Sequence, residues 1–289
     1  MATTRAAIAR RRLGVQLQDL HAVLLQCMVE TMVGRDFAAF ARSCTTCRDA
    51  AAGALHAVVL NEMVRRLKAG KIIGDAICAK RPALVVPAGV MRIGDHAFFS
   101  CTSLISIVLP AGVTSVRDGA FEHCTALASI VLPAGLMSIG DCAFHGCTAL
   151  TSIVLPSSFT SIGDRAFLNC RTLAFITLPG SLTKLGSDAF LNCTSLTAIA
   201  IPDGVVTIED GTFASCRSLA SVTLPANLIT IKNCAFCGCS ALRSIALPES
   251  VTDIDRYAFY GCNVLDAPSR ERIRAICWAA IFEDVLIQF

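Results

Sequence analysis

The sequence has little charge and few aromatic residues other than phenylalanine. Only 16% of its 289 residues are charged, and it contains one tryptophan and two tyrosines beside 15 phenylalanines. Hydrophobic residues nevertheless make up 54% of the chain, which excludes a disordered protein and predicts a large buried core. No uninterrupted apolar run reaches the ~18 residues that a membrane helix needs, so we expect no membrane span.

Beyond its first third, the chain also lacks an excess of positive charge. Residues 1–83 hold 13 Lys/Arg and 6 Asp/Glu, which gives +7, whereas residues 84–265 hold 9 and 12, which gives −3. The long central region is therefore not expected to bind nucleic acid.

A secretory signal is missing from the first residues. They run into Arg10, Arg11 and Arg12 without a continuous apolar segment and a cleavage site. An organelle-targeting peptide remains as a second interpretation of this arginine-rich start. In a long chain without a signal, the 16 cysteines favour reduced thiols over a disulfide scaffold. We therefore expect an intracellular, cytoplasmic protein.

A repeat of 23 residues organises most of the chain. Three residue types recur eight times each at this interval: proline from Pro87 to Pro248, phenylalanine from Phe98 to Phe259, and cysteine from Cys101 to Cys262. A strict period of this length is typical of a solenoid, in which each repeat, here called a rung, buries its apolar side against its neighbours.

Each rung contains the pattern of a short strand followed by a turn. Ile107 and Leu109 are expected to point inward from one strand, and Ser106 and Val108 outward. A column of small polar residues is predicted to cap a one-turn helix carrying Ala-Phe: Asp95, Asp118, Asp141, Asp164, Ser187, Asp210 and Asn233. A second column is predicted to adopt left-handed backbone before the cysteine: Gly146, Asn169, Asn192, Gly238 and Gly261.

The unit Leu-x-x-Ile-x-Leu-Pro-x-x-Val-x-x-Ile-Gly-x-x-Ala-Phe-x-x-Cys-x-x-Leu resembles the BspA-like (Treponema-type) leucine-rich repeat family over about 84–265. The resemblance implies a binding or surface-adhesion module without chemistry of its own. We accordingly predict an α/β repeat solenoid, a leucine-rich-repeat rod of eight units with parallel strands and one-turn helices.

The ends of the chain differ from the repeat. Asp266 or Ser269 can cap a final helix whose apolar positions, among them Ile273 and Ile276, lie on one face. We predict four regions: a basic flexible tail at 1–16, a three-helix N-terminal bundle at 17–71, the solenoid at 72–265, and a capping helix at 266–289.

Part of the N-terminal region resembles a degenerate F-box. The stretch from Asp36 through Phe37 and Phe40 to Cys44 and Arg48 carries this resemblance, although no Leu-Pro pair opens it. The resemblance implies that residues 20–50 bind a Skp-type ligase subunit. The alternative interpretation is a helical cap for the solenoid.

The residues predict a binding surface and no active site. The cysteine column is interpreted as core packing, the five histidines share no column, and no phosphate-binding loop is present, so we expect no enzyme, metal or cofactor. The outward strand columns are small and uncharged, and only Phe175 is large. The candidate partner-binding residues are Ser152, Val154, Phe175 and Thr177, with Tyr257 and Tyr260 as a second group.

The function predicted from these features is protein–protein recognition. The main hypothesis is an intracellular adaptor with an F-box-like N-terminus, whose solenoid binds a client protein. The alternative hypothesis is an exported surface or adhesion protein of the BspA-like type. The identity of the partner is not specified by the residues.

Overall fold

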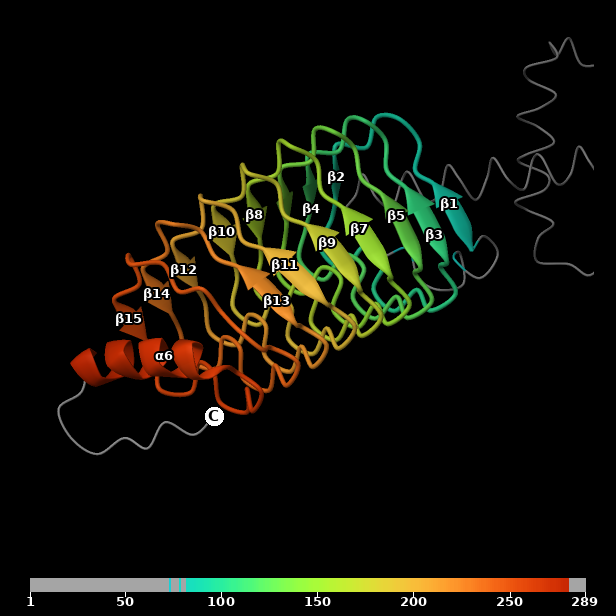
Figure 1. The fold of residues 1–289 in the computed structure, drawn as a ribbon. Helices are drawn as coiled ribbons and strands as arrows, with labels where there is room; N and C mark the ends of the chain where they lie inside the picture. Colours follow the sequence, from blue (N-terminus) through green and yellow to red (C-terminus); the bar gives the residue numbers. More distant parts are fainter. Residues whose placement is uncertain (1–72, 74–77, 79–81, 281–289) are drawn as a thin grey trace, which may run out of the picture. The chain divides into compact units, whose positions relative to one another are not determined.

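The computed structural model describes residues 73, 78 and 82–280 of the chain, and in this part the strands form two rows (Figure 1). The long row holds three-residue strands: β1 (Ala83–Val85), β3 (Ser106–Val108), β5 (Ser129–Val131), β7 (Ser152–Val154), β9 (Phe175–Thr177), β11 (Ala198–Ala200) and β13 (Ser221–Thr223). The short row holds two-residue strands: β2 (Arg92–Ile93), β4 (Ser115–Val116), β6 (Ser138–Ile139), β8 (Ser161–Ile162), β10 (Lys184–Leu185), β12 (Thr207–Ile208), β14 (Thr230–Ile231) and β15 (Asp253–Ile254).

All strand pairs in both rows are parallel, and the register equals the sequence period. Ser106 pairs with Ser129, for example, and Ile107 with Ile130. From β5 to β13, the middle residue of each long-row strand is buried and its two neighbours are exposed. The predicted parallel solenoid with a 23-residue repeat is thus confirmed. It follows that residues 23 apart lie side by side.

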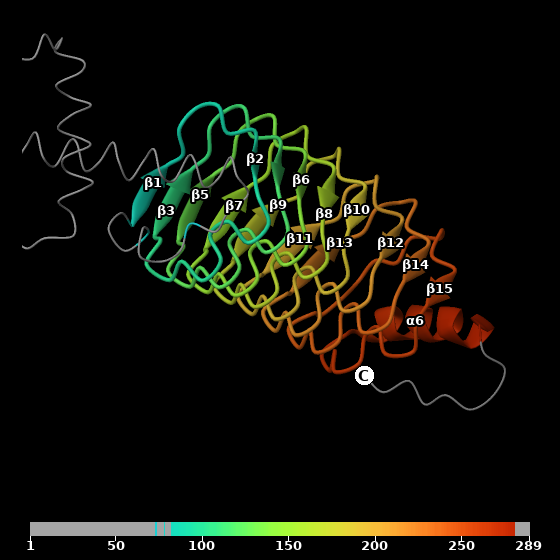
Figure 2. The same cartoon turned by 180° about the vertical axis from the view of Figure 1, so that it is seen from behind.

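The last rung corrects the prediction of eight equal units. Residues 244–246 form no strand, and the backbone N–H and C=O of Ile245 both bond to the Ser269 hydroxyl, at 3.0 and 3.3 Å. This serine lies on helix α6 (Ala267–Ala280), which closes this end of the solenoid (Figure 2). The Asp266 carboxylate accepts a hydrogen bond from the Ser269 N–H at 3.0 Å and caps the helix. Ile273 and Ile276 are buried, as predicted for a covering helix.

The predicted one-turn helices are wrong, because each of these segments is a chain of turns. Ala97 N–H donates within its rung to the Gly94 carbonyl at 3.2 Å, whereas His96 N–H donates across to Asp118 of the next rung at 2.8 Å. The same alternation continues through the segment, so every second N–H is used between rungs and no helical ladder forms. Between residues 82 and 280, α6 is the single helix, and the fold is a β-solenoid.

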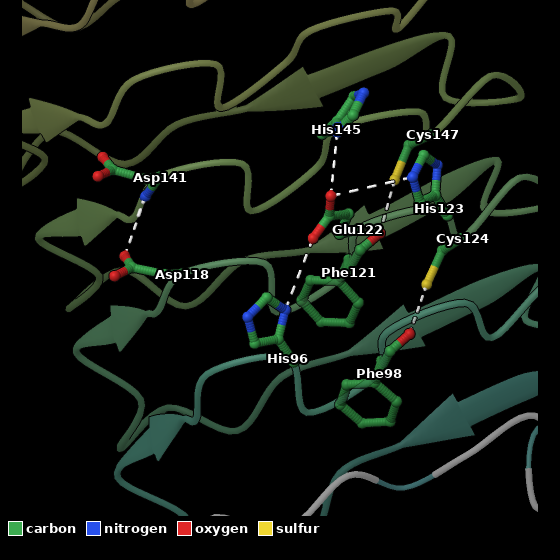
Figure 3. A network of polar contacts seen from close by, with 10 residues as sticks. All are labelled: His96, Phe98, Asp118, Phe121, Glu122, His123, Cys124, Asp141, His145 and Cys147. Carbon is green, nitrogen blue, oxygen red and sulfur yellow. Dashed lines mark hydrogen bonds and ion pairs between the residues drawn. The ribbon is translucent and has the colours of Figure 1, made fainter.

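The aspartate column also has a role different from the predicted helix caps. Asp118 Oδ1 accepts a hydrogen bond from the backbone N–H of Asp141 at 3.0 Å (Figure 3). Asp141 Oδ1 in turn accepts one from the backbone N–H of Asp164 at 2.8 Å. Each of these carboxylates therefore accepts a hydrogen bond from a backbone N–H group of the next rung. The predicted left-handed residues before the cysteines are confirmed, with φ from 61° to 78°: Gly146, Asn169, Asn192, Gly238 and Gly261.

Stacked phenylalanine rings and cysteine thiols join the rungs inside the core. Neighbouring rings of the column from Phe98 to Phe259 lie 5.0 to 5.6 Å apart between centroids, with interplanar angles of 1° to 13°. From Cys124 to Cys262, each column thiol donates to the phenylalanine carbonyl 26 residues earlier, at 3.0 to 3.2 Å. Core packing was predicted for these cysteines, but this hydrogen bond was not.

Burial makes the column thiols unreactive. It raises the pKa of Cys170, Cys216 and Cys262 to about 12 and that of Cys277 to about 11. Since the thiolate is the reactive form of cysteine, these groups stay protonated and inert at neutral pH. No disulfide joins the 13 cysteines that the structure describes.

Several predictions concern residues that the structure does not describe. The basic tail at 1–16, the bundle at 17–71 and the F-box-like segment 20–50 all lie outside the described residues. At the start of the predicted solenoid at 72–265, Ile73 and Cys78 are described and buried, and the Ile73 N–H donates to the Ala97 carbonyl at 2.6 Å. Within the described part, no helix has the length and apolar character needed to cross a membrane.

Truncating a stacked ring should destabilise the solenoid far more than truncating an exposed one. Phe167 is fully buried between Phe144 and Phe190, so Phe167→Ala should lower the free energy of unfolding by about 3–5 kcal/mol. Phe175→Ala is the matched control, since Phe175 is exposed, and its effect should stay within about 0.5 kcal/mol. Urea unfolding followed by circular dichroism measures both, and equal losses would contradict the assignment of the core.

The raised thiol pKa values predict instability in base. The folded state holds the Cys170 proton up to about pH 12, whereas an unfolded thiol releases it near pH 8.5. The stabilising contribution is therefore complete below about pH 8.5 and is lost as the pH rises, by about 1.4 kcal/mol per pH unit for each such thiol. Cys170→Ala should show a correspondingly shallower decline in urea unfolding between pH 8 and 10. Identical slopes for both proteins would refute this origin of the decline.

Candidate functional site

The outward face of the long row is the candidate binding surface. Because side chains alternate along a strand, the first and third residues of each strand point away from the core. Those columns contain no Asp, Glu, Lys or Arg in any of the seven strands. The face therefore offers apolar and hydroxyl groups to a partner, and no charge that would attract a polyanion.

Four of the predicted binding residues come together on this face. Ser152 on β7 pairs with Phe175 on β9, and Val154 on β7 pairs with Thr177 on β9. Val154 is 80% exposed and Phe175 is 67% exposed, the two highest values among the large hydrophobic residues that are described. We call these four residues the β7–β9 patch. They lie at the centre of the long row (Figure 1).

The two predicted tyrosines lie elsewhere. Tyr257 and Tyr260 belong to the turn segment that follows β15 in the last rung, and both are 44% exposed. Their rings meet edge to face with centroids 6.3 Å apart, and the Arg256 guanidinium lies 5.1 Å from the Tyr257 centroid. The rung position of these tyrosines differs from that of Phe175, so the structure does not join them to the β7–β9 patch.

An exposed valine row extends the patch, whereas the sequence indicated only that the outward columns are small and uncharged. Val85, Val108 and Val131 occupy the same strand position as Val154, and consecutive valines of this set pair in register between β1, β3 and β5. All four are exposed. The signal was available, because the valines stand 23 residues apart. A contiguous apolar row on a surface is typical of an interaction site.

A second group of polar side chains was missed in the sequence. Glu122, His123 and His145 lie close together at the turn edge of two successive rungs (Figure 3). The histidines share no column, and the sequence therefore predicted no cluster. The sequence does contain a signal for this group. Glu122 and His145 are 23 residues apart, which is the repeat period, and this spacing places a carboxylate beside an imidazole. Among the described residues this is the one group whose ligand atoms are arranged to hold a metal ion.

Comparison with known proteins supports the repeat assignment. The family model for the BspA type leucine rich repeat region matches residues 76–197 and 183–276. A crystal structure of a leucine-rich repeat protein of T. pallidum is 32% identical, with a TM-score of 0.56, and the match covers 71% of this chain and 85% of that one. A leucine-rich repeat protein of Bacteroides ovatus is 35% identical, with a TM-score of 0.58, over 60% of this chain and 48% of its own length. The comparison with curated proteins finds no match.

The predicted intracellular, cytoplasmic location is contradicted by the family. The BspA type family model matches residues 76–197 and 183–276, and this is the family whose resemblance implied a surface or adhesion module. A structure from Faecalibacterium prausnitzii, described as a leucine rich cell surface protein, is also similar: it is 27% identical with a TM-score of 0.45, over 71% of this chain and 65% of that one. The prediction rested on the missing secretory signal, from which reduced thiols were inferred. Burial gives these thiols another reason to stay unpaired, since it suppresses the reactive thiolate.

The F-box and adaptor interpretation gains no support from these comparisons. The matched region begins at residue 76, after the segment 20–50 that carried the resemblance. The match instead covers the residues in which proline, phenylalanine and cysteine columns build the stacked rungs. On this repeat and on the family match, the chain belongs to the BspA-type leucine-rich repeat family.

Proposed function

We propose that this chain is a non-catalytic module of a cell-surface protein, and that it binds another protein through the β7–β9 patch and the adjoining valine row. Leucine-rich repeat families are generally binding modules without catalysis, and the name of the F. prausnitzii relative places that protein at the cell surface. The observation that carries the proposal is the exposed apolar row, with Val154 and Phe175 at its centre.

The row has the properties of a protein-binding surface. Its side chains are held by strands whose middle residues are packed in the core, so little conformational freedom is lost when a partner covers them. Phe175 supplies the aromatic side chain that dominates many interfaces, and its neighbours Ser152 and Thr177 offer hydroxyl groups that can orient a partner. An adhesion module of this kind would bind an extracellular glycoprotein.

The proposal can be tested by binding to purified matrix glycoproteins. The full chain is immobilised and a panel of these proteins is passed over it, with Val154→Glu and Phe175→Glu in parallel. A carboxylate on either residue would be buried in the complex without a partner, so we expect binding at least about tenfold weaker. Surface plasmon resonance gives the affinity, and thermal unfolding shows whether each variant is folded.

Ile229→Glu is the matched control for this experiment. Ile229 is also an exposed large hydrophobic residue, but it lies beside the short row, directly before β14. Its substitution should leave the affinity unchanged. Absence of binding to every matrix glycoprotein, or equal losses in all three variants, would overturn the proposed function.

A further inference from the structure

We propose that Glu122, His123 and His145 form a binding site for a divalent transition-metal ion of the Zn²⁺ type. The proposal is independent of the binding surface, because the group lies in the turn segments and not on the long row (Figure 3). One ligand atom from each of the three residues lies within 4.8 Å of the other two.

The distances within the group suit tetrahedral coordination. Glu122 Oε1 lies 3.1 Å from His145 Nδ1 and 3.9 Å from His123 Nε2. Zinc–ligand bonds near 2.1 Å place tetrahedral ligands about 3.4 Å apart, so the first distance would lengthen by about 0.3 Å and the second would shorten by about 0.5 Å. Two imidazoles and one carboxylate are an established donor set for zinc in proteins, and imidazole favours such ions over Mg²⁺ and Ca²⁺.

The solenoid holds these donors in place before any ion binds. Glu122 and His145 occupy the same position in successive rungs, and the His123 N–H donates to the His145 carbonyl at 2.7 Å. Glu122 and His145 are half-buried, with side-chain exposures of 17% and 20%, so their rotamers are restricted by packing. Little rearrangement is needed for binding, which favours affinity.

Two glycines leave the space that the imidazoles occupy. A Cβ atom at Gly146 would lie 2.6 Å from His123 Nδ1, and one at Gly119 would lie within contact distance of the His96 ring. Both glycines have positive φ, at 72° and 59°. The position of Gly119 is taken by larger residues in the next rungs, such as Arg165, and glycine returns there at Gly211.

The charges around Glu122 favour a cation. His96 Nδ1 lies 3.6 Å from Glu122 Oε2, so imidazoles of three rungs surround one carboxylate. Within the described part of the chain, these three histidines are the ion-pair partners of Glu122, and no lysine or arginine competes for its oxygens. A bound ion would link the rung of Glu122 and His123 to the rung of His145, and would thereby stabilise the solenoid.

The test is a titration of the EDTA-treated full chain with Co²⁺ and with Zn²⁺, in the presence of a phosphine reductant. The wild-type chain should bind one equivalent of metal at this site. His145→Ala and His123→Ala should not bind this equivalent, or should bind it at least about 100-fold more weakly, since even the loss of an outer-shell partner lowers metal affinity 10–100-fold. The extra Co²⁺ equivalent should show visible d–d bands without a sulfur-to-cobalt charge-transfer band. Zn²⁺ should raise the unfolding temperature of the wild type more than that of either variant.

Two matched controls separate this site from the other donors of the chain. His56→Ala removes a histidine outside the group, and the double variant Cys234→Ser and Cys237→Ser removes two half-buried thiols of another rung. Both control variants should still bind the equivalent of metal that His145→Ala loses. Unfolding curves without metal verify that each variant is folded. Two results would overturn the proposal. One is that the wild type and His145→Ala bind the metal with equal stoichiometry and affinity. The other is a sulfur-to-cobalt charge-transfer band for the equivalent of Co²⁺ that His145→Ala loses.

Discussion

Each rung of this protein depends on the rung beside it for its hydrogen bonds as well as for its core. The strands pair only between rungs, and in the turn segments every second N–H donates to the next rung. The phenylalanine carbonyls receive the thiols of the following rung, and the aspartate carboxylates receive its backbone N–H groups. Because unpaired buried polar groups are costly, a rung is stable only within the stack.

This dependence imposes an exact repeat length. One inserted residue would move Phe, Cys and Asp out of register with their partners at once, since all three contacts use intervals set by the same period. At the end of the stack, the described part of the chain has no further strand to pair with the backbone of Ile245. The Ser269 hydroxyl bonds to the N–H and C=O of Ile245 in its place. Helix α6 thus completes the hydrogen bonding that the repeat leaves open.

The proposed functions depend on side chains at positions where the packing between rungs does not fix the residue type. Val154 and Phe175 are mostly exposed on the outward face of the long row, so the packing of the core places little constraint on them. The turn edge is equally permissive, and there Glu122, His123 and His145 meet across two rungs. Val154 continues a row that follows the repeat, whereas Phe175 and the group of Glu122, His123 and His145 are local departures from it.

The sequence by itself determined the period, the parallel solenoid, the inward and outward strand positions, the capping helix and the position of the β7–β9 patch. These features follow from a strict interval that fixes which residues are neighbours. Only the tertiary structure decided that the Ala-Phe segments are turns and that Asp118 bonds to the rung after it, because those outcomes depend on hydrogen bonds between rungs that compete with local ones. It also decided that His123 meets His145, since the direction of a side chain out of a turn is set by backbone angles and by the space that Gly146 leaves.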